Sequence, residues 1–357
     1  MRDWREGSRT RLGKVAASIM GRATHADRLD PSELTSVLVC RINARMGNTM
    51  FLTPLIARLR ELLPRAAIDV ASAYPYAREL LEPIPRVRRV VVFPYKGVSL
   101  PWRYTAALRN IRRERYDLAI DPATDSTSDR VVLSLARARY RLGFASVSQW
   151  APLTHAVTLP QTLVHQAVQP VYLLSRALSA EPDVGAVRLQ LSLSDPELAA
   201  GRAAVEQAIP SSGAPNRVFG YFAHATGQKT IAKEYWRAFL DAFLALEPDA
   251  VPLEILPSAQ QAPTDARSAV LHLKSPRALA AAIASMRVFM AADTGPMHLA
   301  SSTDVPTVAL FHASDPALYG PLKPCDLALD PAQHPPAELA QRCRTLWHTA
   351  RRLGAVA

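Results

Sequence analysis

The polar segment at residues 293–298 has the residue types of an anion-binding turn. It follows an apolar run and opens a helical pattern in which proline suits the first position. The first N–H groups of a helix have no partner inside it, and the helix dipole favours negative charge, so this turn predicts a diphosphate site. A histidine in the first turn is either a packing residue or, beside an anion, part of the site. The candidate residues are Asp293, Thr294, Gly295, Pro296, Met297 and His298.

A second polar segment follows the apolar run at residues 218–222 and contains His224, Thr226, Lys229 and Lys233. The chain has only six lysines among its 42 basic residues, and two of them lie in this segment. A compact ammonium group suits a phosphate, which favours Lys229 or Lys233 as an anion contact. The alternative is a solvated helix start that carries ordinary lysines.

A third segment follows the first apolar run of the chain and contains Arg41, Gly47 and Asn48. Gly47 and Asn48 fall at a strand-to-helix turn, where backbone N–H groups can face a ligand. The spacing matches neither a phosphate-binding loop that ends in Gly-Lys-Ser/Thr nor a Gly-x-Gly-x-x-Gly fingerprint. The segment is therefore either a ligand-facing turn or a plain turn.

Strand and helix patterns alternate around these segments and predict right-handed βαβ units with parallel sheets. Ligands of such sheets bind outside the carboxyl ends of the strands, and with two domains the cleft between them is the expected site. Predicted strands are residues 36–42, 68–71, 89–93, 117–121, 188–194, 218–222, 252–256, 287–290 and 307–311. Predicted helices are residues 50–63, 76–81, 101–114, 128–138, 195–209, 233–246, 276–285, 297–303 and 337–352.

The composition agrees with two globular domains. The chain has 357 residues, of which 49% are apolar and 20% are charged. Disordered proteins are typically less apolar and more highly charged, so this composition argues against a disordered chain. We expect a basic leader at residues 1–34, an N-terminal domain at 35–190, a connecting segment at 191–216 and a C-terminal domain at 217–357. The leader is either frayed or lies on anionic lipid headgroups.

The net charge indicates the class of partner, and the cysteines indicate the cellular compartment. The net charge of +11 favours an anionic partner, such as a phosphorylated small molecule, a nucleic acid or an acidic membrane surface. Cys40, Cys325 and Cys343 form neither a disulfide framework nor a Cys-x-x-Cys zinc pair, which indicates a reducing, cytoplasmic compartment. No apolar run approaches the ~20 residues that span a bilayer, and the N-terminus lacks the apolar core of a signal peptide.

The segments together resemble the family 9 glycosyltransferases, whose best-known members are the ADP-heptose:lipopolysaccharide heptosyltransferases. The resemblance covers roughly residues 36–345 and is strongest at residues 293–298 and 305–311. Arg41, Gly47 and Asn48, followed by Thr53-Pro54, are similar to the family's N-terminal motif. Residues 117–121 and 141–144 resemble its fourth-strand region, and His165 matches a histidine that begins the next helix. Lys229, seven residues before Trp236, falls where the family has a phosphate-contacting lysine, with Lys233 as the alternative.

The resemblance implies a GT-B fold, in which two Rossmann-like, doubly wound domains face each other across a cleft. It places the acceptor at the N-terminal half, with Arg41, Gly47, Asn48 and Asp121. It places the nucleotide sugar at the C-terminal half, with His224, Thr226, Lys229, Lys233 and residues 293–298. An ADP-linked sugar would be the substrate and no cofactor is implied. The sequence contains no Asp-x-Asp pair, so we expect no metal clamp on the diphosphate.

The implied reaction is an inverting transfer, in which a base deprotonates an acceptor hydroxyl that attacks the anomeric carbon. Lys229 and the N–H groups of residues 294–297 would stabilise the leaving nucleoside diphosphate. Heptosyltransferases have an aspartate as the proposed base where this chain has Asn48, and an amide cannot accept that proton. Asp121, Asp125 and Asp129 are the alternatives, and Asp125 is favoured because serine and threonine neighbours would keep it ionised in a loop.

The expected acceptor is a glycolipid or oligosaccharide of a lipopolysaccharide or other surface glycan. The protein would then work in the cytoplasm, peripherally on an anionic membrane. A second hypothesis is a non-catalytic relative that binds nucleotide sugar or glycolipid as a scaffold, and Asn48 favours it. A nucleic-acid binder is the third, but the arginines are spread along the chain and no binding motif accompanies them.

Overall fold

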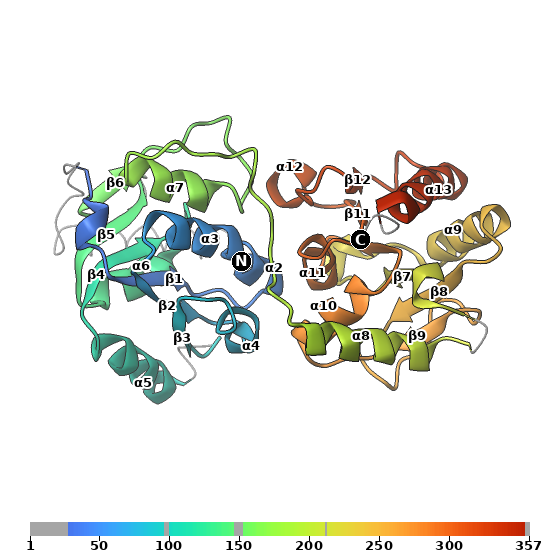
Figure 1. Cartoon of the computed structure of the whole chain (residues 1–357), viewed down its shortest axis with the longest axis horizontal. Helices are drawn as coiled ribbons and strands as arrows, with labels where there is room; N and C mark the ends of the chain where they lie inside the picture. Colours follow the sequence, from blue (N-terminus) through green and yellow to red (C-terminus); the bar gives the residue numbers. More distant parts are fainter. Residues whose placement is uncertain (1–27, 96–99, 146–152, 211–212, 354–357) are drawn as a thin grey trace. The chain divides into compact units, whose positions relative to one another are not determined.

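The chain folds into two compact units, Met1–Val187 and Arg188–Ala357, each built on a six-stranded parallel sheet (Figure 1). The computed structural model describes residues 28–95, 100–145, 153–210 and 213–353. The strand order is β3-β2-β1-β4-β5-β6 in the first unit and β12-β11-β10-β7-β8-β9 in the second. In each unit the order reverses beside the first strand, which is the switch point where doubly wound sheets bind ligands.

The first strand of the first unit is β1, whose four central residues are fully buried because they are apolar and covered on both faces. Its strands are β1 (Ser36–Arg41), β2 (Ala67–Ser72), β3 (Val87–Val92), β4 (Tyr116–Asp121), β5 (Ala138–Phe144) and β6 (His155–Val157). Its helices are η1 (Pro31–Glu33), α2 (Met46–Met50), α3 (Thr53–Leu62), α4 (Ala77–Leu81), α5 (Pro101–Arg112), α6 (Thr127–Leu135) and α7 (Gln169–Ala177).

The second unit has a hydrophobic core between α9, α13 and the sheet. The α9 residues Trp236, Phe239, Leu240 and Phe243 recur at helical spacing and are all buried. The strands are β7 (Val218–Phe222), β8 (Val251–Ile255), β9 (Ala269–Leu271), β10 (Val288–Ala292), β11 (Thr307–Leu310) and β12 (Leu327–Leu329). The helices are α8 (Asp195–Ala208), η3 (Pro215–Arg217), η4 (Gly227–Lys229), α9 (Lys233–Leu246), α10 (Pro276–Ala284), α11 (Gly295–Ser301), α12 (Pro316–Tyr319) and α13 (Pro336–Leu353).

Helices α8 and α10 pack against each other at a glycine. A Cβ atom on Gly201 would lie 2.3 Å from the backbone carbon of Ala281 and 2.5 Å from the nitrogen of Ala282. The contact is secured at the start of α8, where Ser194 and Glu197 form a capping box. Glu197 also accepts a hydrogen bond of 2.6 Å from the α10 residue Arg277.

Several expectations about the elements were wrong. Residues 188–194 are not a strand: Leu189 and Leu191 alternate inward as predicted, but the segment is an extended connection that pairs with neither sheet. The predicted helix at 50–63 begins only at Thr53 as α3, which carries Pro54 in its first turn, and residue 50 instead ends the separate helix α2. The predicted helix at 128–138 ends at Leu135, and β5 follows it.

The first described residues also differ from the expectation. Residues 1–27 of the predicted leader lie outside the described residues. Leu29 and Leu34 are buried, and the Leu29 N–H donates to the Ala177 carbonyl at 3.3 Å. The first unit therefore includes residues that we had assigned to the leader.

Each unit holds one fully buried cysteine in its core, Cys40 in the first and Cys343 in the second. Cys325 is partly exposed, and all three thiols are free. Burial raises the pKa of each thiol. None of the helices in the described part of the chain is long and apolar enough to cross a membrane.

Candidate active site

Asp293, directly after β10, is the centre of a polar cluster in the second unit. Its carboxylate forms an ion pair with the Lys229 ammonium, whose Nζ also lies 3.3 Å from the Asp293 carbonyl oxygen. The Ser314 hydroxyl donates to Oδ2 at 2.6 Å, and His298 Nε2 lies 3.5 Å from Oδ1. Three segments far apart in the chain thus meet at one carboxylate.

The cluster fixes the charge of Asp293 and the direction of Lys229. Burial raises the pKa of the Asp293 carboxyl, but hydrogen bonds from His298, Lys229 and Ser314 outweigh it and bring this pKa well below its usual range. The carboxylate is therefore ionised at neutral pH. Two of the three N–H donors of Lys229 point to Asp293, which leaves one donor for a ligand. The Lys229 side chain is 39% exposed and so accessible to one.

Helix α11 begins immediately beside this cluster. Thr294 is its N-cap, and the first backbone bond runs from the His298 N–H to the Thr294 carbonyl at 3.4 Å. The N–H groups of Gly295 and Met297 precede that bond and suit an anion. The Met297 side chain is fully buried, so this residue offers a ligand its backbone alone.

A hollow of about 580 Å³ opens at the carboxyl ends of β11 and β12. Ser314 lines it and bonds to Asp293, so the hollow adjoins the cluster. Its other polar lining residues are His312, Asp315, Asp330, Gln333 and His334. This volume is in the range of small-molecule sites, and carboxylates, amides and imidazoles can all hydrogen-bond hydroxyl groups.

His224, which we predicted to contact the ligand, is held by a buried carboxylate. Its Nε2 lies 2.9 Å from Glu254 Oε1, and its Nδ1 lies 2.8 Å from Gln261 Nε2. Glu254 is fully buried and also accepts hydrogen bonds from Tyr221 and Thr264. Because its Nδ1 is hydrogen-bonded to Gln261 and its Nε2 lies beside the Glu254 carboxylate, His224 is suited to fixing the turn that follows it.

That turn distinguishes the two lysines. Gly227 has a φ of 64°, a left-handed conformation that glycine adopts without strain, and it starts the short η4 helix that ends at Lys229. Lys233, at the start of α9, is exposed, as is Thr226, and no described side chain forms an ion pair with Lys233. Of the two, Lys229 is the lysine that joins the Asp293 cluster.

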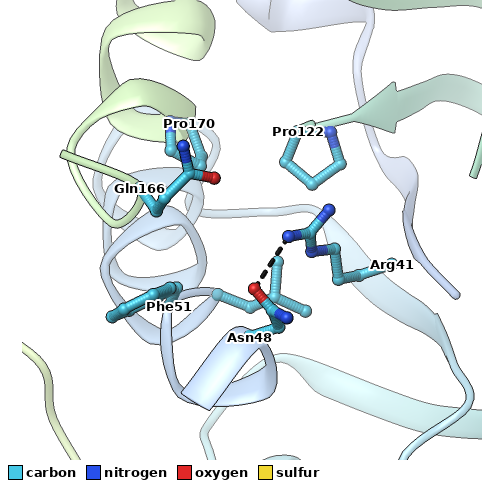
Figure 2. A pocket seen from close by; sticks show the side chains of 7 residues that line it. Arg41, Asn48, Phe51, Pro122, Gln166 and Pro170 are labelled. Carbon is cyan, nitrogen blue, oxygen red and sulfur yellow. Dashed lines mark hydrogen bonds between the residues drawn. The ribbon is translucent and has the colours of Figure 1, made fainter. Parts of the chain in front are cut away.

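Arg41 contacts two of the other predicted residues of the first unit, and Figure 2 shows one of them, Asn48. Arg41 Nη2 donates to Asn48 Oδ1 at 2.9 Å, and Nη1 lies 3.2 Å from Asp129 Oδ2. A small hollow of about 10 Å³, room for about one water molecule, lies between Arg41 and Asn48 on one side and the proline and glutamine side chains opposite them. Its lining residues are Arg41, Asn48, Phe51, Leu52, Pro122, Gln166 and Pro170.

The three candidate bases differ in their access to solvent. Asp121 and Asp129 are fully buried; Arg130 Nε donates to Asp121 at 2.8 Å, and the Ile42 N–H donates to Asp129 at 2.5 Å. Burial, together with the charge of Asp129, raises the pKa of Asp121 to about 7, and burial also raises that of Asp129. Asp125, in the loop between β4 and α6, is exposed.

Other predicted residues have supporting positions. The His165 ring makes an edge contact with Phe51 at 5.8 Å, and its Nδ1 accepts the Ala167 N–H at 3.1 Å. Gly47 lies in α2, one residue before Asn48. No group of three or more His, Cys, Asp or Glu side chains that could hold a metal ion occurs among the described residues.

The sequence did not identify three residues that organise these sites. Ser314 bridges to Asp293 from 21 positions away, Glu254 holds His224, and Arg130 pairs with Asp121. Ser314 does carry a weak signal, because Ser314-Asp-Pro316 directly follows the β11 segment. Nothing in the spacing of Glu254 or Arg130 indicates a partner.

Comparisons with known proteins agree with this architecture. The model of glycosyltransferase family 9 (heptosyltransferase) matches residues 104–346. No curated protein matches the sequence. A family 9 glycosyl transferase from Veillonella parvula has a similar structure, with 17% identity, a TM-score of 0.73, and coverage of 91% of this chain and 100% of that one.

Two heptosyltransferases of E. coli are also similar in structure. ADP-heptose lps heptosyltransferase II shares 18% identity, with a TM-score of 0.69 over 89% of this chain and 100% of that one. Heptosyltransferase WaaC, solved with ADP, shares 17% identity, with a TM-score of 0.66 over 88% of this chain and 100% of that one. Together with the two parallel sheets, these likenesses show an α/β fold of the GT-B type.

Proposed function

The chain belongs to glycosyltransferase family 9, and we propose that it transfers heptose or a related sugar from a nucleoside diphosphate donor to a lipopolysaccharide-type or other surface-glycan acceptor. ADP is the proposed nucleotide, because WaaC, of similar fold, has been solved with ADP. A glycolipid acceptor would bring the protein to the cytoplasmic face of a membrane, as a peripheral protein.

The Asp293 cluster is the observation that carries the donor half of this proposal. Lys229 has one ammonium donor left for a phosphate oxygen, and the N–H groups at the start of α11 directly follow Asp293, the residue that Lys229 contacts. The diphosphate therefore binds between Lys229 and α11, and Asp293 holds the ammonium in place. The adjoining hollow of about 580 Å³ is large enough to take the sugar.

The same groups account for the departure of the nucleotide. Negative charge grows on the diphosphate as the bond from its oxygen to the anomeric carbon breaks, and a preorganised ammonium and backbone dipoles stabilise that charge. The acceptor oxygen attacks the opposite face of the sugar, so configuration inverts. Charge stabilisation by Lys229 and α11 gives the reaction no need for a divalent cation.

Asp125 is the proposed base. Asp121 and Asp129 are fully buried and hydrogen-bonded to arginines, so an acceptor hydroxyl has no path to them. Asn48 is an amide whose oxygen already accepts from Arg41. The exposure of Asp125 after β4 supports its role as the proton acceptor.

A panel of ADP-, GDP-, UDP- and dTDP-sugars and CMP-sugar tests this function, with nucleotide release measured with and without lipopolysaccharide acceptors. We expect release from one donor class, increased by acceptor and unchanged by EDTA. Asp125→Asn should lower kcat by about 10²-fold, while the control Asp183→Asn, another exposed aspartate of the first unit, should leave it unchanged.

Asn48 favours one alternative, a non-catalytic relative that binds nucleotide sugar or glycolipid as a scaffold. The two possibilities are separated by the same panel. Saturable binding of a nucleotide sugar without release of nucleotide under any acceptor would support the scaffold and refute the transferase.

A further inference from the structure

The exposed aromatic side chains of the described residues gather at one corner of the first unit. Tyr76, Tyr95 and Trp102 are 43%, 73% and 64% exposed. Tyr76 follows β2 and Tyr95 follows β3, and these neighbouring strands are parallel, so both residues lie beyond the same edge of the sheet. We call these three residues the aromatic corner.

A buried ring contact brings Trp102 to the same place. Phe93, just after β3, meets Tyr104 of α5 edge-on with ring centroids 5.1 Å apart, and Phe93 is 1% exposed. Tyr95 and Trp102 are each two residues from this pair. The contact therefore holds the start of α5 against the end of β3 and places both exposed rings beside that junction.

Helix α5 continues from the corner with an uncompensated basic face. Ile111 is buried, whereas Arg103, Arg109, Arg112 and Arg113 are exposed. The sequence has no Asp or Glu from residue 95 to 113, and none of the four arginines forms an ion pair with a described carboxylate. Arg112 donates to the Leu135 carbonyl, and the first acidic residue, Glu114, lies 3.4 Å from Arg88. Figure 1 shows α5 at the outer side of the first unit, with one side turned away from the sheet.

Helix α13 is also rich in arginine, but its described arginine side chains are paired and its tryptophan is buried. Its exposed Arg342 and Arg344 form ion pairs with Glu338 and Glu247. Its tryptophan, Trp347, is 2% exposed and belongs to the core. Only in α5, among the described helices, do unpaired arginines accompany an exposed tryptophan.

We infer that the aromatic corner and the arginine face of α5 dock the protein on an anionic lipid bilayer. Tryptophan and tyrosine suit the headgroup region because they combine an apolar ring with a polar group, and arginines are attracted to anionic headgroups by about fivefold in affinity for each well-placed residue. Aromatic residues at one end and cations along one face are typical of a helix that lies on a membrane surface.

If the proposed function holds, the docking surface would also bring the enzyme close to its glycolipid acceptor. The aromatic corner lies at the carboxyl edge of the first sheet, the edge at which β1 ends with Arg41. Lipid contact at this corner would present that edge to a glycolipid held in the same leaflet. The docking itself requires neither nucleotide nor acceptor.

Cosedimentation of the full chain with phosphatidylcholine vesicles, with and without phosphatidylglycerol, tests the inference. We expect binding only to the vesicles that contain phosphatidylglycerol, with a steep loss as salt rises. Arg103→Ser with Arg109→Ser should weaken it about 25-fold, from two steps of about fivefold. Tyr95→Ala with Trp102→Ala should weaken it at least tenfold. Because all four side chains are exposed, thermal melts of these variants should match the parent.

The control is Arg342→Ser with Arg344→Ser, which removes the same charge from α13. Equal loss in this control, undiminished binding by both α5 variants, or equal binding to the two kinds of vesicle would overturn the inference. The inference would also be overturned if the protein bound single-stranded DNA but not vesicles, and if the α5 variants abolished that DNA binding. Since no nucleotide or sugar is present, failure here is distinct from failure of the sugar-transfer panel.

Discussion

Replacement of Lys229 by alanine tests how the donor site holds a diphosphate. Two unit charges about 4 Å apart attract by roughly 1 kcal/mol in water and about 4 kcal/mol at a typical protein surface. Lys229 is 39% exposed and shares its charge with Asp293, so we take an intermediate contribution of about 2 kcal/mol. This corresponds to a Kd for ADP about 30-fold weaker in Lys229→Ala.

The neighbouring carboxylate adds a second expectation. Without the ammonium, Asp293 keeps its negative charge, because Ser314 and His298 still contact it, and it would repel the diphosphate. Asp293→Asn in the Lys229→Ala background should therefore recover part of the affinity, with a coupling of about 1 kcal/mol between the two sites.

Calorimetric titration with ADP measures each of these variants, and Lys233→Ala is the matched control. Lys233 is exposed at the start of α9, only four positions away, and its loss should change the Kd by less than about twofold. The reasoning is refuted if Lys229→Ala binds as tightly as the parent, or if the two lysine variants lose affinity equally.

Three further predictions concern the rest of the molecule. Asn48→Asp in the Asp125→Asn background should raise kcat by about 10²-fold, because a carboxylate beside Arg41 is ionised at neutral pH and can replace the lost base; a kcat that stays at the Asp125→Asn level would contradict this. Gly201→Ala should destabilise the second unit by about 1–3 kcal/mol, since its Cβ would overlap the α10 backbone. The control is Gly185→Ala, whose Cβ meets nothing closer than 3.9 Å, and this variant should melt like the parent. The pKa of Asp121 is raised to about 7 in the folded protein. Between pH about 4 and about 7 the folded protein therefore keeps a proton that the unfolded chain releases. The free energy of unfolding should fall as the pH rises through this range. Denaturant titrations across that range should give a flatter dependence for Asp121→Asn, and an equal slope would count against the buried proton.

Much of the fold follows from local patterns in the sequence. Helix α9 was predicted at its observed bounds because its apolar residues recur at helical spacing, and β7 because a strand buried on both faces is apolar throughout. The short outer strands β6, β9 and β12 were missed, since three residues carry too little pattern. Residues 188–194 show the opposite case: side chains alternate in any extended segment, and the pattern does not reveal whether its backbone pairs.

The parts of the candidate site that are formed by residues close together in the sequence were predictable. The turn before α11 and the segment around Lys229 were found because strand ends and helix starts expose N–H groups and side chains at known positions. The partners of these residues come from distant strands, as Ser314 does for Asp293 and Glu254 for His224. Such pairs depend on which strands are neighbours and in what register, which one sequence does not specify.

The two buried cysteines give each unit its own reporter of unfolding. Cys40 and Cys343 lie in separate cores and are shielded from thiol reagents until the surrounding unit opens. In a Cys325→Ser background, the alkylation rate of each remaining thiol would follow the opening of one unit, which mass spectrometry can resolve by peptide. A nucleotide bound at the Asp293 cluster would then slow the labelling of Cys343. If the labelling of Cys40 slowed as well, the two halves of the chain would open as a single cooperative structure.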